Sequence, residues 1–478
     1  MPPPVIVWLR DDLRLDDQPA IRAAAERPAL FVYVRETSPR FRALGGASNW
    51  WLDGSLRAFG EALAGKGARL DLLQGESETA ILALAKAAGA AEVLWTRRYG
   101  GEEAAADKRL EAELGKAGIA VHSFNGQLLR EPWDVVTDAG SPFKVFSAYW
   151  RRSRALGAFD APRPPPPRLQ SAPWPDEAPV RVTLESLALL PRHPDWAGGL
   201  RQMWRPGEAG AWERAQRFLE AALAHYPDRR DFLSGEPTST LSPHLRFGEI
   251  SPRRLIALAD AAGASGGSSA RAVEKFASEI GWREFSYSLL HNAPNLATRA
   301  WQPRFEAFPW RGDETALRAW TRGRTGYPVV DAGLRELWAT GYMHNRVRMI
   351  AASFLIKHLL IDWRRGEEWF WDTLCDADPA NNPASWQWVA GSGADAAPYF
   401  RIFNPVLQGQ KFDPEGAYVR RWVPELARLD DAHLHAPWLA PREALQRGGV
   451  ELGQTYPAPI IDHDFARKRA LAALASLA

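Results

Sequence analysis

The sequence contains a single cysteine, Cys375, and no apolar run long enough to cross a membrane. One cysteine excludes an internal disulfide framework and any zinc or iron–sulfur site built from several thiolates of one chain. A spanning helix needs about 20 consecutive apolar residues, and the apolar stretch 5–9 near the start is too short even for a signal peptide. We therefore expect a cytoplasmic protein without membrane association.

Lysine is also scarce, with nine residues against fifty arginines. Arginine binds phosphate in a planar, bidentate way, but a formal net charge of only +2 does not indicate nucleic-acid binding without a local basic patch. Tryptophan, in contrast, is abundant, with 22 residues. Core packing explains most tryptophans, so their positions must show whether any of them does more.

The first 130 residues indicate an α/β domain. Ala-rich helical stretches near 48–65 and 76–88 alternate with short β-branched runs at 5–9, 30–34, 92–95 and 119–124. This βαβ pattern predicts an open, parallel, Rossmann-like sheet over residues 1–130. The usual dinucleotide site is not expected, because neither a GxGxxG motif nor a Walker sequence is present.

The rest of the chain divides into a linker and a helical domain. Residues 131–209 are predicted to link the domains, since the stretch from Ala161 is too rich in proline for a helix or a central strand. Residues 210–478 hold long helical stretches rich in Ala, Leu, Arg and Trp, which predict a large all-α domain. Within it, 346–361 is apolar on most faces and predicts a helix buried inside a bundle.

Three polar clusters are candidates for the site of chemistry. The segment 376–403 holds acids, amides and two Trp in apolar surroundings, and buried polar groups of this kind need Arg partners, a polar ligand or a structural network. The hydroxyl-rich segment 238–251 suits a helix N-terminus that receives an anion, or simple capping. In the segment 340–350, Arg346 and Arg348 are two positions apart and are expected to serve different partners.

No arrangement of conventional catalytic residues stands out. The sequence shows no Ser/His/Asp triad, no HExxH, no paired catalytic Glu and no Cys/His metal spacing, and His344 is typical of a structural histidine. A polar pocket with many aromatics but no evident acid, base or nucleophile indicates that a bound cofactor carries the chemistry. No metal site is predicted.

Seven motifs resemble the photolyase and cryptochrome family in order and spacing, and the resemblance covers nearly the whole chain. They are WLRDDLRLDD near the start, TSTLSPHL, WREF at 282–285, TGYPVVDAGLREL, GYMHNRVRM, LIDW and WQWVAGSGADAAPYFRIFNP. The resemblance implies an α/β domain that can hold an antenna pigment and a helical domain that binds FAD.

The resemblance also implies the residues that hold and reduce the flavin. Contacts to the FAD phosphates and adjoining groups fall on Tyr226, Thr238, Ser239, Thr240, Leu241 and Ser242. Further FAD contacts fall on Phe276, Asn345, Arg348, Asp376, Asp378 and Asn382. Of these, Arg348 is the expected ion partner of Asp376, and Asn382 is expected to face flavin N5. The chain of tryptophans that photoreduces the flavin is expected at Trp386, Trp363 and Trp310.

The DNA contacts resemble those of enzymes that repair cyclobutane pyrimidine dimers. The pocket for the lesion is expected at Glu279, Trp282, Asn345, Arg346 and Met349. Eukaryotic (6-4) enzymes have His in place of Asn345, and Trp282 is expected to be the wall on which a flipped dimer stacks. Phosphates are expected to contact Arg230, Gln408 and the group Arg318, Arg322 and Arg324, for which a solvated charged face is the alternative.

The implied function is light-dependent repair of cyclobutane pyrimidine dimers in UV-damaged DNA, by electron transfer from photoexcited reduced FAD. The alternative is a cryptochrome-like blue-light receptor. Two features favour repair: plant cryptochromes have Asp at the position of Asn382, and no long tail follows residue 478. We expect a deoxyribodipyrimidine photo-lyase that acts as a monomer.

An antenna pigment is the last expectation. The stretch GGASNWWLDGSL resembles the bacterial branch called class III, in which the expected pigment is 5,10-methenyltetrahydrofolate. Glu36 and Glu103 are the predicted contacts. Glu102 departs from the family pattern, which often has Asn there, so deazaflavin or no antenna stays open.

Overall fold

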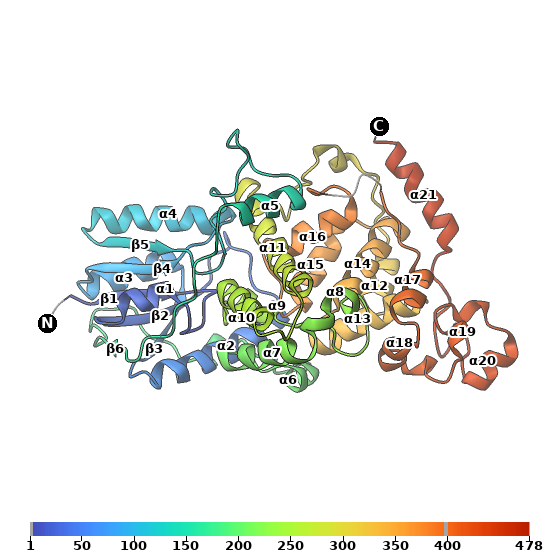
Figure 1. Ribbon diagram of the computed structural model, residues 1–478, viewed down its shortest axis with the longest axis horizontal. Coiled ribbons are helices and arrows are strands. Elements are labelled where there is room, and N and C mark those ends of the chain that lie inside the picture. The colour runs from blue at the N-terminus through green and yellow to red at the C-terminus, as the bar shows by residue number, and fades with distance from the viewer. Residues whose placement is uncertain (1–2, 396–399, 478) are drawn as a thin grey trace. The chain divides into compact units, whose positions relative to one another are not determined.

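The computed structural model describes residues 3–395 and 400–477, and its course is drawn in Figure 1. Two compact units are present. The first comprises Met1–Ala197, Arg201–Ala224 and Ser239–Pro294, and the second comprises Gly198–Leu200, His225–Thr238 and Asn295–Ala478. The division into 1–130, 131–209 and 210–478 stays a prediction. The two units divide the chain elsewhere, because residues 239–294 cluster with the first unit.

A parallel sheet forms the centre of the first unit. Its strands, in the order β3-β2-β1-β4-β5, are β1 (Val5–Leu9), β2 (Pro28–Glu36), β3 (Leu70–Gly75), β4 (Glu92–Thr96) and β5 (Ala120–Phe124). The two-residue β6 (Gln170–Ser171) pairs with β2. The predicted α/β domain with its parallel sheet is confirmed. The sequence analysis does not predict β3, because Asp71 and Gln74 interrupt its apolar run.

Helices surround this sheet and extend the first unit. They are α1 (Pro19–Ala24), α2 (Gly46–Ala64), α3 (Ser77–Ala87), α4 (Gly101–Lys116), α5 (Phe146–Ala155), η1 (Glu185–Leu187), α7 (Glu208–Ala221), α9 (Ser242–Arg246), α10 (Pro252–Ala264) and α11 (Ala270–Asn292). Both α3 and α4 pack on one face of the sheet, where Ile81 and Leu110 join Trp8 and Trp95 in a buried core. The proline-rich residues 161–169 form no helix or strand. Two short elements, α6 (Gly198–Met203) and η2 (Leu223–His225), include residues of both units.

The second unit is helical, and the prediction of a largely helical domain is confirmed. Its elements are α8 (Tyr226–Arg229), η3 (Pro303–Ala307), α12 (Glu314–Thr321), α13 (Pro328–Thr340), α14 (Asn345–Ser353), η4 (Phe354–His358), α15 (Trp363–Thr373), α16 (Asn381–Ala390), α17 (Pro405–Phe412), α18 (Ala417–Trp422), η5 (Pro424–Leu426), α19 (Asp431–Leu434), η6 (Pro437–Leu439), α20 (Arg442–Gly448) and α21 (His463–Ala475). The apolar segment 346–361 forms α14 and the π-helical η4, and both contribute to the unit's main core.

Gly341 shapes the turn between α13 and α14. Its φ of +67° lies in the left-handed region, which glycine adopts without steric cost. A Cβ at this position would lie 2.5 Å from the Sγ of Cys375. The Gly341 carbonyl accepts a hydrogen bond from the Cys375 N–H at 2.8 Å. The turn therefore holds the start of α14 close to the segment that carries Asp376.

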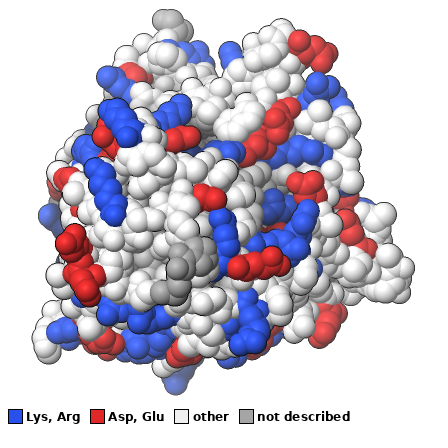
Figure 2. Space-filling model, turned by 90° about the vertical axis from the view of Figure 1, so that its left-hand side faces the viewer, with Lys and Arg blue, Asp and Glu red and all other residues white. Residues whose placement is uncertain are grey.

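The distribution of charged side chains on the surface agrees with the small net charge of the sequence. Basic and acidic side chains are interspersed over the face in Figure 2. No helix among the described residues combines the length and apolar character needed to cross a membrane. Within residues 3–395 and 400–477, no three His, Cys, Asp or Glu side chains group together in a way that could hold a metal ion.

Candidate functional site

A buried ion pair lies at the centre of the polar cluster in the second unit. Arg348 on α14 donates from Nη1 to Oδ1 of Asp376 at 3.0 Å and from Nη2 to Oδ2 at 2.8 Å. Its Nε donates to the Met343 carbonyl at 2.7 Å, and this third hydrogen bond fixes the orientation of the guanidinium. Burial lowers the pKa of Arg348, but the charge and hydrogen bonds of Asp376, together with the nearby Tyr342 and Glu336, outweigh burial and leave that pKa above its ordinary value. The structure thus brings together the two residues that the sequence analysis pairs.

Two more polar side chains lie at the beginning of α16. The Asp378 carboxylate accepts hydrogen bonds from the backbone N–H groups of Ala380 at 2.8 Å and Asn381 at 2.7 Å. The amide nitrogen of Asn382 donates to the carbonyl and to Oε1 of Glu367, at 3.1 and 2.8 Å. Because this nitrogen is turned to Glu367, the side-chain oxygen of Asn382 is the atom left to accept from a ligand.

The three predicted electron-transfer tryptophans belong to the second unit. Trp386 and Trp363 are 2% and 1% exposed, whereas Trp310 is only partly buried. Trp386 on α16 packs against Phe370, with ring centroids 4.9 Å apart. Gly366 on α15 allows this packing, because a Cβ there would lie 2.1 Å from the Trp386 ring. Trp310 is therefore the most accessible of the three, and the order in which they pass electrons stays a prediction.

The two arginines of α14 have different partners, as their spacing predicts. Arg346 donates to Asp231 at 2.6 Å and lies over the Phe412 ring at 4.5 Å, whereas Arg348 is paired with Asp376. Asn345 and Met349, one helical turn apart, are in contact through Nδ2 and Sδ at 3.9 Å.

The remaining predicted DNA contacts of the second unit lie on other elements. Arg230 follows α8 with its guanidinium 5.4 Å from the Tyr226 ring centroid, and Gln408 is partly buried on α17. Arg318, Arg322 and Arg324 are exposed. Exposure suits both phosphate contact and a solvated charged face, so the role of this group stays a prediction.

The predicted contacts of the first unit lie on α11 and near α9. Phe276, Glu279 and Trp282 follow one another at intervals of three residues on α11 and therefore share one side of the helix. Phe276 packs against Phe218 at 4.9 Å, and Glu279 pairs with Lys275 at 2.8 Å.

The predicted phosphate-binding segment runs into α9. Thr240 has a φ of +50°, and its hydroxyl donates to the Ser239 carbonyl and accepts from Arg214 at 2.6 Å. Ser242 begins α9 and Leu241 directly precedes it, whereas Thr238 belongs to the second unit. The Thr240 hydroxyl therefore helps to hold the turn itself.

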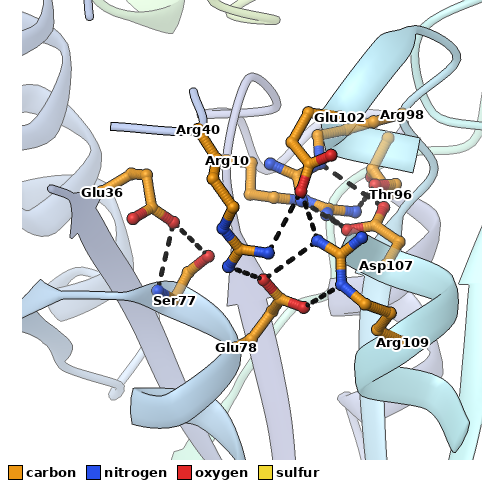
Figure 3. Close-up of polar contacts among 10 residues, drawn as sticks. All are labelled: Arg10, Glu36, Arg40, Ser77, Glu78, Thr96, Arg98, Glu102, Asp107 and Arg109. Atoms are coloured by element: carbon orange, nitrogen blue, oxygen red, sulfur yellow. Dashed lines mark hydrogen bonds and ion pairs between the residues drawn. The ribbon is translucent and has the colours of Figure 1, made fainter. Parts of the chain in front are cut away.

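Polar side chains gather where the strands of the sheet end (Figure 3). Arg10 donates to Asp107 at 2.6 Å and to the Thr96 carbonyl, and Arg98 donates to the same Asp107 carboxylate. Burial lowers the pKa of Arg10 to about 10. Nearer the surface, Arg40 and Arg109 each contact both Glu78 and Glu102 and form a closed ring of alternating charge.

The structure places the two predicted antenna contacts in different roles. Glu36, at the end of β2, accepts from the backbone N–H and the hydroxyl of Ser77 with one carboxylate oxygen. The other oxygen accepts from the N–H groups of Thr37 and Ser38. Two of these four bonds hold the first residue of α3, and the other two hold the turn that follows β2. Burial raises the pKa of Glu103 against the opposing charge of Arg98, and its antenna role stays a prediction.

One group of residues near the predicted lesion wall is absent from the sequence predictions. Phe146 and Trp150 lie on α5, within the predicted linker; Phe146 stacks on Trp282 of α11, and Trp150 stacks on Phe146. The signal was present in the sequence, because aromatic residues four positions apart share one face of a helix.

Two family models match separate parts of the chain. Residues 5–169 match the model described as DNA photolyase, and residues 276–476 match the FAD binding domain of DNA photolyase. These matches agree with the sheet-containing and helical parts of the structure.

Full-length relatives and a solved structure are also similar to the chain. It is 51% identical to the deoxyribodipyrimidine photo-lyase of Agrobacterium fabrum, over 99% of this chain and 98% of that protein. It is 38% identical to cryptochrome-2 of Arabidopsis thaliana, over 97% of this chain and 77% of the relative. The crystal structure of a bacterial class III photolyase from Agrobacterium tumefaciens superposes with a TM-score of 0.95 at 51% identity, over 99% of this chain and 97% of that one. The chain therefore belongs to the DNA photolyase and cryptochrome family.

Proposed function

We propose that this protein is a deoxyribodipyrimidine photo-lyase that uses light and reduced FAD to split cyclobutane pyrimidine dimers in UV-damaged DNA. The observation that carries the proposal is the 51% identity to a deoxyribodipyrimidine photo-lyase along 99% of the chain. The arrangement of polar and aromatic side chains in each unit supports it, as do the family models.

The polar cluster of the second unit fits a flavin. Asp376, Asp378 and Asn382 are each less than a tenth exposed, and their carboxylate and amide oxygens are hydrogen-bond acceptors with more than one lone pair each. A flavin offers ring N–H groups and ribityl hydroxyls that match carboxylate and amide oxygens. In this proposal Arg348 fixes Asp376, and the Asn382 oxygen accepts from flavin N5. The other predicted FAD contacts, including Asn345 and Phe276, keep the roles that the resemblance implies.

When bound and reduced, FAD would supply light-driven donation of one electron to the dimer and its return after the cyclobutane ring opens, so that repair involves no net redox change. The protein's own residues hold this group in a dry environment. The core around Trp386 is apolar, with Phe370 and Trp320 packed at its edges. Such surroundings exclude water and strengthen the electrostatic effect of Arg348 and the nearby carboxylates.

The tryptophans at 386, 363 and 310 are proposed to carry electrons to the oxidised cofactor, separately from repair. We expect Trp386→Phe to slow photoreduction severely and to leave chemically prereduced enzyme active. The matched control is Trp422→Phe, a partly buried tryptophan packed against the same core. Photoreduction at the native rate in Trp386→Phe, or loss of repair by the prereduced variant, would contradict this separation.

The lesion is proposed to enter against Trp282, with Glu279, Asn345, Arg346 and Met349 as further contacts. A carboxylate and an amide can bond the edges of pyrimidines, and the indole ring offers a face for stacking. We expect Trp282→Ala and Glu279→Ala to weaken binding of dimer-containing DNA while FAD stays bound. Unchanged affinity for the dimer would rule out these contacts.

A folate antenna is the second part of the proposal. Of the predicted contacts, Glu36 is already bonded to Thr37, Ser38 and Ser77, so Glu103 is the one proposed to hydrogen-bond the pigment. We expect mass spectrometry of pigment released from the purified protein to find 5,10-methenyltetrahydrofolate, and Glu103→Ala to lower its content. Deazaflavin, or no second pigment, would contradict this assignment.

The decisive experiment uses an oligonucleotide that carries one thymine cyclobutane dimer. Purified, reduced protein is incubated with it under blue light, with darkness and protein-free illumination as controls. We expect thymines to be restored only in the light and in the presence of protein. An absence of repair by protein that holds reducible FAD would contradict the proposal.

A blue-light receptor is the second candidate, and the observation that favours it is the 38% identity to Arabidopsis cryptochrome-2. The repair assay separates the two. A receptor would photoreduce its flavin through the tryptophans without restoring thymines, and it would bind dimer-containing and undamaged oligonucleotides equally.

A further inference from the structure

Helix α5 packs against α11 through a stack of aromatic rings that ends at Trp282. The rings of Phe146 and Trp282 lie nearly parallel, with centroids 3.9 Å apart and planes inclined by 14°. Phe146 continues to Trp150, at 6.5 Å and 12°, and Trp150 to Phe159, at 6.1 Å and 29°. Four rings contributed by three segments of the first unit therefore form one column.

The far end of this column is fixed by polar contacts. Trp150 is buried, and its indole N–H donates to Glu274 of α11 at 2.8 Å. The Arg154 guanidinium lies 5.8 Å from the Trp150 ring centroid and 3.6 Å from the Glu274 carboxylate. Arg130 lies 4.9 Å from the Phe159 centroid. These contacts leave Trp150 little freedom to move along or away from α11.

Gly281, the residue before Trp282, permits this close packing. A Cβ at position 281 would lie 2.5 Å from the Trp150 ring, a distance that real side chains do not adopt. Glycine thus lets α5 approach α11 directly beside Trp282. Because Trp150 is held here, Phe146, one turn earlier on α5, is held over the Trp282 ring.

Stacking on Phe146 determines how Trp282 meets a ligand. One face of the indole is covered by Phe146, so a base can stack only on the other face. An indole held by stacking on one side has lost its rotamer freedom before the ligand arrives, which lowers the entropic cost of binding. Aromatic pairs in this geometry are also attractive beyond the area they bury.

We propose that Phe146 is a positioning residue for lesion binding, which holds Trp282 in the orientation that stacks on a flipped pyrimidine dimer. The inference rests on the proposed function, in which Trp282 is the wall for the lesion. It adds α5 to the machinery, and it gives residues of the predicted linker a part in recognising damaged DNA.

The test measures affinity in the dark, with FAD-loaded protein, for an oligonucleotide carrying one thymine dimer and for its undamaged counterpart. We expect Phe146→Ala to weaken dimer binding roughly tenfold, with unchanged affinity for undamaged DNA and an unchanged repair rate at saturating substrate. Phe146→Tyr keeps the ring and should restore native affinity. Phe146→Leu keeps apolar volume without the ring and should fold as the native protein does while still binding the dimer more weakly.

The matched control is Phe143→Ala. Phe143 lies three positions earlier, is also partly buried, and packs against Tyr149. We expect it to leave dimer affinity unchanged, and an equal loss in Phe143→Ala would show general loosening of the segment and overturn the proposal.

A double variant separates this proposal from the proposed function. If Phe146 acts through Trp282, then Phe146→Ala should cause no further loss in a Trp282→Ala background. A further loss there, or native affinity in both Phe146→Ala and Phe146→Leu, would overturn the positioning role and leave the proposed function standing. Native dimer affinity in Trp282→Ala would overturn the lesion wall and the positioning role together, and absence of light-dependent repair by the native protein would overturn the proposed function itself.

Discussion

The protein contains two assemblies of guanidinium and carboxylate groups that differ in their surroundings. In the second unit, Arg348 and Asp376 form a two-pronged pair in which the guanidinium side chain is 24% and the carboxylate side chain 4% exposed. In the first unit, Arg40, Arg109 and their two glutamates form a ring in which both guanidinium groups are more than 40% exposed. The ring has more contacts, but the single pair has lost far more water.

The number of ion pairs in an assembly is therefore a poor guide to its contribution to stability. Exposed pairs contribute little because water and salt screen them and because long side chains lose entropy when held. In a buried pair the loss of one partner leaves an uncompensated charge in a medium of low dielectric constant. We therefore expect substitutions in the two assemblies to have very different effects.

The largest effect is expected for Asp376→Ala. Removing the carboxylate leaves the partly buried Arg348 guanidinium without its charge partner, at a cost of about 3 kcal/mol in the free energy of unfolding, the lower end of the range for buried pairs. Denaturant unfolding of the apoprotein measures this cost apart from any loss of cofactor, and the flavin content of the purified variant should fall as well. A cost below about 1 kcal/mol would contradict this expectation, because it would show that the pair stabilises the protein no more than an exposed pair does.

The next effect concerns Glu336, a buried carboxyl that hydrogen-bonds a hydroxyl instead of an arginine. It accepts from Tyr418 at 2.6 Å, and burial raises its pKa from 4.5 to about 7. Between these values the folded protein retains a proton that the unfolded chain has lost. The stabilisation is therefore fully present below about pH 4.5 and is lost as the pH rises through about 7.

Glu336→Gln should remove this pH dependence. Relative to the variant, the native protein is expected to lose up to about 1.4 kcal/mol of stability per pH unit between about pH 5 and 7. Unfolding free energies measured at several pH values for both proteins test it. Parallel stability curves would show that Glu336 titrates normally.

A smaller effect is expected for Glu36→Ala, because this carboxylate is hydrogen-bonded by neutral N–H groups and a hydroxyl, so its loss leaves no cation unpaired. Loss of its bonds to the first residue of α3 should cost about 1 kcal/mol in unfolding free energy. The antenna content should not change, since all four observed contacts of Glu36 are made within the protein. Loss of pigment without loss of stability would instead support the predicted antenna role.

The smallest effect is expected for Glu78→Gln in the exposed ring. The change should cost less than about 1 kcal/mol, and the cost should shrink as salt is added. Unfolding at low and high ionic strength measures it. A loss comparable with that of Asp376→Ala would break the distinction between the two assemblies.

Much of the fold was accessible from local pattern. The β-branched runs at 5–9 and 92–95 predict strands that the structure contains as β1 and β4, because alternation and apolar runs reflect contacts made by each segment itself. The different partners of Arg346 and Arg348 also follow from spacing on one helix. The strand β3 was missed, since a buried aspartate is unexpected within an apolar strand. Asp71 is accommodated there by ion pairs with Arg69 and Arg181, and local sequence does not reveal these partners.

The candidate site was only partly accessible in this way. Motifs that resemble the family indicate Asp376, Asn382 and Trp386, but they do not say which atoms of these residues are already engaged. The structure shows that the amide nitrogen of Asn382 is turned to Glu367 and that the Glu36 carboxylate accepts from the first residue of α3. Hydrogen-bond partners far apart in sequence depend on the packing of whole elements, which no local pattern encodes.

The sequence by itself determined the family, the order of sheet and helices, and the residue types available for flavin and DNA. The tertiary structure decided that Arg346 meets Asp231, 115 positions away, and that Phe146 from the predicted linker lies over Trp282. The physical reason is that residue type sets what a side chain can do, whereas its partners are set by the close approach of elements, as where Gly281 admits Trp150.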